Sequence, residues 1–280
     1  MNKKLPVVAT LKEAILLPFK HLGCVLKVGF PLILFFVLQF IISYFLLFDG
    51  GILRQSDDVF FAINLISLPL NVAALVIGVV GCHRIFLLDH ARENTRLFNW
   101  TGNEIKVVGW WLVIGIAFLL MAIPFFLIFF VMGGFNIIAR MGFAELAVTF
   151  LFFMPLLYIM VRWLLVIPSA AIGIHGKTLS WSWRLTAGNG FRLMLLVSIF
   201  PFLFNVLMVC IGVLFATIFS SLAYATLLQV LSTVLWLVMG VIQVALLSLS
   251  YKFLVENVVV EEDENDEPAE ALAAQENGAS

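Results

Sequence analysis

Six long runs of apolar residues dominate the sequence and are separated by short polar segments. They cover residues 25–48, 60–82, 107–132, 146–167, 193–218 and 222–250. Each run is about 20 residues or longer, which is the length an α-helix needs to cross a bilayer core about 30 Å thick. The pattern predicts an all-α membrane protein with six transmembrane helices.

Composition supports this interpretation and excludes a water-soluble fold. The chain is 63% hydrophobic and 12% charged, whereas soluble domains have about 45–50% apolar and about 25% charged residues. We therefore expect one transmembrane domain, residues 25–255, preceded by an amphipathic N-terminal segment, residues 1–24, and followed by a tail, residues 256–280. In the N-terminal segment, Thr10 and Glu13 have the spacing of a capping box, which predicts that a short helix starts there.

Charge divides the polar segments into two classes. The segments before the first run, between the second and third, between the fourth and fifth, and after the sixth contain nearly all Lys and Arg residues, whereas the other side has only Arg54 and Arg140. Because basic loops stay in the cytoplasm, both termini are predicted to be cytoplasmic. Most tryptophans, among them Trp163, Trp181 and Trp183, fall at the same boundary, as expected of interfacial residues.

The tail from Glu256 onward is acidic throughout and contains no Lys or Arg, so the rest of the chain is basic. Its low hydrophobicity and uncompensated charge predict disorder.

The helices that leave the cytoplasmic side begin alike, with a glycine four residues before a basic residue at Gly23, Gly102 and Gly188. Three helical hairpins, each with a cytoplasmic interfacial piece, would produce this pattern. Positive-inside selection alone would also place a basic residue at each point, so both explanations stay open.

The sequence offers no recognisable catalytic chemistry. No Asp, Glu or His is predicted near the middle of a span, and the cluster around His83 and His90 matches no metal-binding spacing and is assigned to a solvated loop. Nucleotide-binding and hydrolase motifs are absent, and the three cysteines are scattered among apolar residues. We therefore predict no enzymatic activity, no cofactor, no metal site and no nucleic-acid binding.

The segment from Arg162 to Arg192 joins two spans and contains four basic residues and no acidic one. Thr178 can cap a short helix that Gly188 ends, and Asn189 can cap the next span. The candidates for contact with anionic lipid headgroups are Arg162, Lys177, Arg184, Arg192, Trp181 and Trp183. For Arg162, snorkelling to the headgroups or a helix-capping contact is the favoured role.

Amide side chains and prolines inside the spans suggest a second hypothesis. Asn64, Asn71 and Asn205 lie in or beside proline-bearing stretches, where amides usually hydrogen-bond between helices. As the alternative, these amides would line a polar cavity near the midplane of a transporter or permease subunit.

The pattern R-W-L-L-x-x-P-S-A, followed after about ten residues by S-W-R-L-T-x-G-N-x-x-R-L, resembles the signature of a family of six-helix bacterial inner-membrane proteins. That family is related to the membrane domain of some glycerophosphodiester phosphodiesterases. The resemblance covers residues 162–193 and implies a location in the bacterial cytoplasmic membrane. In the family, Arg162, Pro168, Trp183, Arg184, Gly188, Asn189 and Arg192 are signature positions without a chemical role. The segment Ile174–Lys177 departs from the family by being basic. Nothing after Val255 resembles a phosphodiesterase domain, so that activity is not implied.

These observations lead to the main hypothesis, a non-enzymatic multi-pass membrane protein. Its basic, tryptophan-rich cytoplasmic face would bind anionic lipid, a protein partner or a second copy of the chain.

Overall fold

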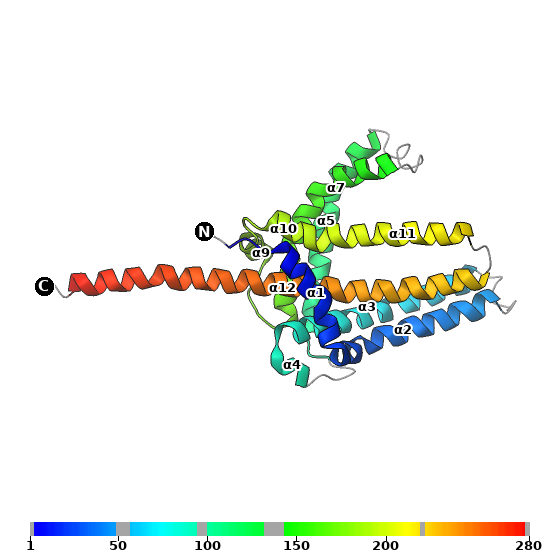
Figure 1. Cartoon of the computed structure of the whole chain (residues 1–280), viewed down its shortest axis with the longest axis horizontal. Coiled ribbons are helices and arrows are strands. Elements are labelled where there is room, and N and C mark those ends of the chain that lie inside the picture. The colour runs from blue at the N-terminus through cyan, green and yellow to red at the C-terminus, as the bar shows by residue number, and fades with distance from the viewer. Residues whose placement is uncertain (1–2, 49–56, 94–99, 132–142, 219–221, 278–280) are drawn as a thin grey trace.

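The computed structural model describes residues 3–48, 57–93, 100–131, 143–218 and 222–277. These residues form helices joined by short turns (Figure 1). The helices are α1 (Val7–Lys20), α2 (Leu22–Phe48), α3 (Asp57–Leu87), α4 (Asp89–Glu93), α5 (Asn103–Val131), α7 (Phe143–Trp163), α8 (Val166–Ala171), α9 (Leu179–Leu185), α10 (Gly190–Met194), the π-helix η2 (Leu195–Ile199), α11 (Phe200–Ile218) and α12 (Leu222–Asn277).

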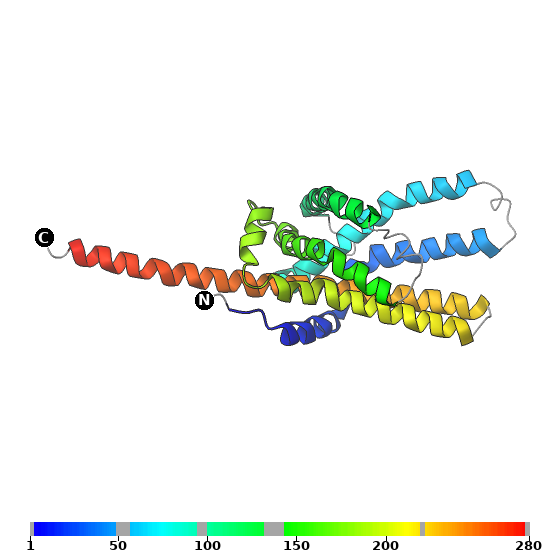
Figure 2. The ribbon, with the colours of Figure 1, turned by 90° about the horizontal axis from the view of Figure 1, so that it is seen from above.

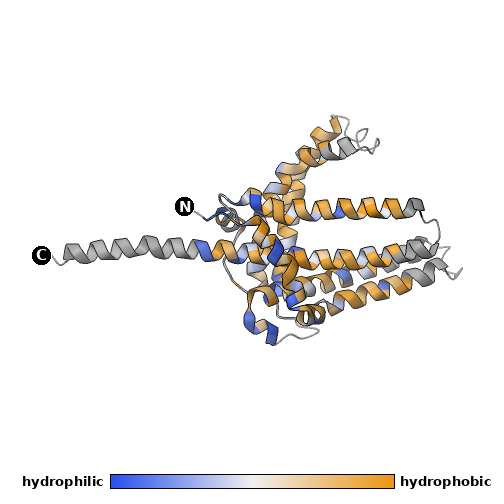
Figure 3. Cartoon of the chain, viewed as in Figure 1, coloured by the Kyte–Doolittle hydropathy of each residue, from blue (hydrophilic) through white to orange (hydrophobic). Residues whose placement is uncertain are grey.

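Six helical segments in the described part of the chain are long and apolar enough to cross a membrane, which confirms the predicted fold class. Large apolar side chains such as Leu119, Leu127 and Phe130 are more than half exposed on them. Water would oppose such exposure, whereas lipid would not. Figure 3 shows the apolar residues along these helices and the hydrophilic ones gathered where α1, α4 and α9 lie. We call that part of the molecule the basic end.

The spans pair as three hairpins: α2 packs on α3, α5 on α7, and α11 on α12. The α5–α7 pair is held by phenylalanine contacts, with ring centroids 5.8 Å apart for Phe125 and Phe152 and 5.7 Å apart for Phe129 and Phe153. This hairpin leaves the basic end at an angle to the other four spans (Figures 1 and 2).

The two hairpin helices α2 and α3 are in close contact at Gly81. A Cβ atom added there would lie 2.0 Å from Cγ1 of Val28 and 3.1 Å from its Cβ. The contact therefore requires a residue without a side chain at position 81. Position 78, one turn earlier, has no such requirement, because a Cβ atom added to Gly78 would meet no heavy atom within 4 Å among the described residues.

We expect Gly81→Ala to destabilise the protein by about 1–2 kcal/mol, because overpacking a close helix contact forces the helices apart. Denaturation by sodium dodecyl sulfate in mixed micelles measures this change. Gly78→Ala is the matched control, and Val28→Ala should recover part of the loss. A Gly81→Ala protein as stable as the control would show that α2 and α3 do not approach here.

Two prolines interrupt the regular helices next to the central segment. Pro168 has no N–H to donate to the carbonyl of Leu164, and the chain turns at Leu164–Leu165 between α7 and α8. Pro201 similarly follows η2, where the helix widens into π geometry. The predicted span 146–167 therefore contains the end of α7, a turn and the start of α8. All six residues of α8 are buried.

Both termini differ from the sequence-based expectation. Helix α1 begins at Val7, with Thr10 donating its backbone N–H to Pro6 at 2.9 Å, so Thr10 lies buried one turn inside the helix and the capping-box prediction was wrong. Helix α1 packs across α12. The predicted disordered tail is instead described as a continuation of α12 to Asn277, pointing away from the spans (Figure 1). Glu, Ala and Leu favour helix, and extending a packed helix needs no new nucleus.

Candidate functional site

Arg162, near the end of α7, is the centre of a polar cluster at the basic end. Its side chain is 7% exposed, and the guanidinium carbon lies 3.6 Å from the ring centroid of Trp183 and 5.6 Å from that of Tyr158. Nε donates to Oγ1 of Thr186 at 2.7 Å, and Nη2 donates to the backbone carbonyl of Trp183. The charge is thus placed at the carbonyl end of α9, where the backbone dipoles are negative.

Hydroxyl groups complete the connection between α7 and α9. Ser182 Oγ donates to the carbonyl of Arg162 at 2.5 Å, and Thr186 Oγ1 lies 3.0 Å from the carbonyls of both Ser182 and Trp183. Because Ser182 and Thr186 are fully buried, these bonds replace water that the groups have lost. Arg162 therefore acts as an internal helix cap, one of the two roles favoured from the sequence, and its guanidinium is directed away from solvent.

Local backbone chemistry sets where α9 starts and ends. Thr178 Oγ1 accepts the N–H of Trp181 at 3.2 Å, which confirms the predicted cap. Gly188 has φ of +74°, a left-handed conformation that favours glycine. It lies in the turn that follows α9, and the prediction that it ends this helix was wrong, because α9 ends at Leu185 with Thr186 as its C-cap. We call this unit, formed by Tyr158–Arg162 of α7 and by residues 178–192, the junction.

Asn189 occupies the N-cap position of α10, but its side chain makes no capping hydrogen bond. It binds the N-terminal segment instead: Oδ1 accepts the N–H of Leu5 at 2.7 Å, and Nδ2 donates to the carbonyl of Lys3 at 3.2 Å. Arg192 Nη1 donates to the carbonyl of Leu5 at 2.8 Å. The predicted capping role of Asn189 was therefore wrong, and Asn189 and Arg192 together hold residues 3–5.

Trp181 and Trp183 point to different sides of α9. The Trp181 ring lies 6.3 Å from that of Tyr251 on α12, and Lys177 Nζ lies 4.8 Å from the Trp181 centroid. Trp183 contacts α7 through Arg162 and stays 38% exposed. Both indoles thus join α9 to neighbouring spans and leave part of their surface free.

The structure separates the predicted headgroup contacts into two groups. Arg162 and Arg192 are bound to protein groups, whereas Lys177 is half-exposed against Trp181 and Arg184 is exposed. Within the described parts of the chain, the side chain of Arg184 has no hydrogen-bond or ion-pair partner, and the same holds for the exposed side chains of Lys3 and Lys4. Lys177, Arg184, Lys3 and Lys4 are therefore among the cations that are free to meet an anion.

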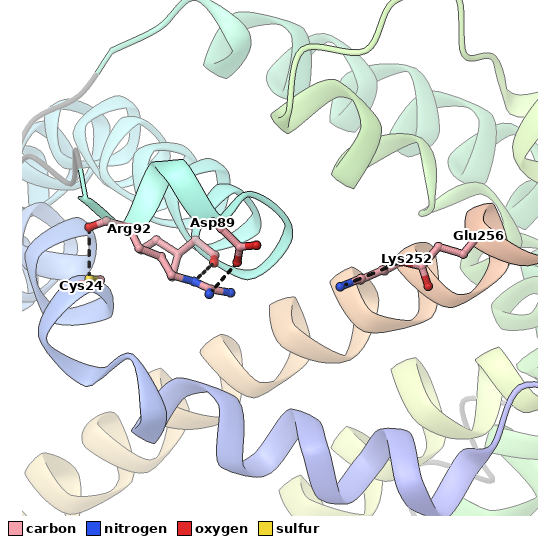
Figure 4. Close-up of polar contacts among 6 residues, drawn as sticks. Cys24, Asp89, Arg92, Lys252 and Glu256 are labelled. Carbon is pink, nitrogen blue, oxygen red and sulfur yellow. Dashed lines mark hydrogen bonds and ion pairs between the residues drawn. The ribbon is translucent and has the colours of Figure 1, made fainter.

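A second group of charges at the basic end lies where α1, α4 and α12 face one another (Figure 4). Arg92 Nη1 pairs with Asp89 at 2.7 Å and its Nε donates to the carbonyl of Ile85 at 3.0 Å, while Lys252 and Glu256 are 4.0 Å apart. Partial burial, followed by the charges of Arg92 and Lys20, lowers the pKa of His21 from its usual value. Both Arg92 and Lys252 are thus paired with a carboxylate.

The amides proposed for a polar cavity are not gathered in the interior. Asn205 is exposed on α11 and donates to the carbonyl of Pro201 in the same helix at 2.8 Å. Asn71 is half-buried on α3. The side chain of Asn64 lies outside the described residues.

Sequence reasoning missed two buried polar groups. His83 is 1% exposed, because α3 continues to Leu87, and its Nδ1 lies 2.7 Å from Oγ of Ser248 on α12. The assignment of His83 to a solvated loop was therefore wrong. Glu104 is also buried and accepts the N–H of Thr101 at 2.9 Å, a contact that the spacing Thr101-Gly-Asn-Glu104 could have indicated.

Among the described residues, no three His, Cys, Asp or Glu side chains lie close enough together to hold a metal ion. In comparisons with protein-family models, curated proteins and solved structures, the chain matches none of them. The resemblance over residues 162–193 consequently remains a prediction, and the argument for function rests on the geometry of the basic end.

Proposed function

We propose that this chain is a non-enzymatic multi-pass protein of the bacterial cytoplasmic membrane, with both termini cytoplasmic, whose junction binds the headgroups of anionic lipids. One observation carries the proposal: Arg184 is exposed without a protein partner, while Arg162 and Arg192 are satisfied inside the junction. The hydrogen bonds of Arg162 and Arg192 fix the shape of the junction, and the exposed cations provide charge that can bind an anion.

The chemistry of the exposed groups suits a phospholipid. An arginine fork can donate two hydrogen bonds to one phosphate, and a lysine adds a point charge. The half-exposed Trp181 and the exposed Trp183 present indole rings, which favour the boundary between headgroups and acyl chains. Near an anionic leaflet each basic residue contributes about 1 kcal/mol.

The double variant Lys177→Gln/Arg184→Gln should bind dioleoylphosphatidylglycerol about 30-fold more weakly than the wild type, because two such contributions are lost. Native mass spectrometry of the full chain in detergent with added lipid measures this, with dioleoylphosphatidylcholine as the neutral reference. Lys106→Gln/Lys252→Gln is the matched control, since it removes two exposed cations that already have partners, Asn103 and Glu256. Equal phosphatidylglycerol binding by both double variants would contradict the proposed function.

The transporter alternative has less support, because Asn205 faces outward and is bonded within its own helix. A protein partner or a second copy of the chain would meet the same exposed cations. Such a partner would have to present an acidic surface. Weaker lipid binding by Lys177→Gln/Arg184→Gln, measured without any protein partner, would favour the lipid as the ligand.

A further inference from the structure

The N-terminal segment is held as an extended peptide by the start of α10. The single amide of Asn189 accepts from the N–H of Leu5 and donates to the carbonyl of Lys3, so it brackets Lys4 as the edge of a neighbouring strand would. Arg192 adds the bond to the carbonyl of Leu5. Leu5 is 0% exposed and Asn189 2% exposed, so this attachment is a buried and satisfied one.

The hydrogen bonds to the backbone of residues 3–5 also determine the direction of their side chains. Leu5 points into the protein, and the side chains of Lys3 and Lys4 are exposed. We call the three hydrogen bonds from Asn189 and Arg192 to residues 3–5 the clamp. Because Asn189 belongs to the junction, the clamp attaches two lysines from the start of the chain to it. In both views the N-terminal segment runs beside the start of α10, and Figure 2 shows α9 on the other side of α12 (Figures 1 and 2).

The side chains of Lys3 and Lys4, like those of Lys177 and Arg184, pair with no carboxylate of the described residues. Lys3 and Lys4 are adjacent in the chain, and holding two like charges close together costs free energy unless an anion is bound there. A clamp that only anchored α1 would work equally well with neutral residues at positions 3 and 4.

We propose that Lys3 and Lys4 are headgroup ligands of the anionic-lipid site and that Asn189 is the residue that positions them; this inference rests on the proposed function of the junction. A lipid fits better than free phosphate, because α1, which follows residues 3–5, exposes apolar side chains along its length. Val8 is 80% and Phe19 is 56% exposed. A phospholipid offers acyl chains to these side chains and phosphate to the lysines.

Native mass spectrometry of the full chain with dioleoylphosphatidylglycerol tests the inference. Lys3→Gln/Lys4→Gln, which alters no buried group, should weaken binding about 30-fold. Asn189→Ala, which changes no charge, should weaken binding about fivefold or more, because the lysines lose their fixed position. In the Asn189→Ala background the lysine substitutions should add less than they do in the wild type, since the two changes act through the same contact.

The outcomes separate the inference from the function beneath it. Wild-type binding by Lys3→Gln/Lys4→Gln, combined with weak binding by Lys177→Gln/Arg184→Gln, would overturn the inference and leave the function standing. Wild-type binding by both would overturn the two together. Additive effects of Asn189→Ala and the lysine substitutions would show that Asn189 acts on the fold alone. Displacement of the lipid by excess inorganic phosphate would identify a soluble-anion site and overturn the choice of ligand.

Discussion

Replacing Arg162 by methionine is expected to destabilise the protein by about 3 kcal/mol. Methionine fills similar space but leaves the carbonyl of Trp183 without its donor, removes the bond to Thr186, and ends the stacking on the Trp183 ring. Buried acceptors without a partner carry the full cost of desolvation. Denaturation by sodium dodecyl sulfate in mixed micelles, followed by tryptophan fluorescence, measures the difference.

Arg84→Met is the matched control, because Arg84 also lies at the basic end but is half-exposed and has no polar partner in the described ranges. Arg162→Lys should recover little, since an ammonium keeps the charge but lacks the planar fork. Equal stability of the Arg162→Met and Arg84→Met proteins would show that Arg162 does not hold α9 on α7. Weakened lipid binding at unchanged stability would instead return Arg162 to the headgroup contacts.

The second large effect is expected at Gly190. A Cβ atom there would lie 2.7 Å from Oη of Tyr158, 2.9 Å from its Cε2 and 3.0 Å from Cδ of Arg162. Gly190→Val adds two more methyl groups against these packed side chains, so we expect a loss of about 3 kcal/mol, measured by the same denaturation. Gly212→Val is the control, because nothing described lies within 4 Å of a Cβ at that glycine.

If Gly190→Val and Gly212→Val were equally stable, α10 would not pack on α7 as closely as the structure has it. A large loss of stability in Gly190→Val alone would explain why a glycine follows Asn189. Asn189 binds Leu5, and the next residue packs closely against the buried Arg162.

Much of the fold could be predicted because its strongest determinant is local. The length of an apolar run decides whether a helix can cross a bilayer, and six runs gave six candidate spans. The start of α9 was also predictable, since Thr178 binds a backbone N–H only three residues away. Helix ends were harder to predict. The predicted span 60–82 stops before His83, whereas α3 continues to Leu87 and the imidazole contacts Ser248 on α12.

The contents of the candidate site were less predictable, because they depend on contacts between distant parts of the chain. A basic residue at a membrane boundary favours a headgroup contact, and only the packing of α9 on α7 shows that Arg162 is enclosed. Asn189 stands at a capping position, yet its amide binds Leu5, which is 184 residues away. No local pattern contains that partner.

The most direct test of the proposed role determines on which side of the membrane the junction lies. Lys177→Cys, in a chain whose Cys24, Cys82 and Cys210 are replaced by alanine, provides a single thiol in the segment before α9. With the junction at the cytoplasmic leaflet, a membrane-impermeant maleimide should label this thiol only after the cells are permeabilised. Labelling in intact cells would place the junction outside and contradict the proposed orientation.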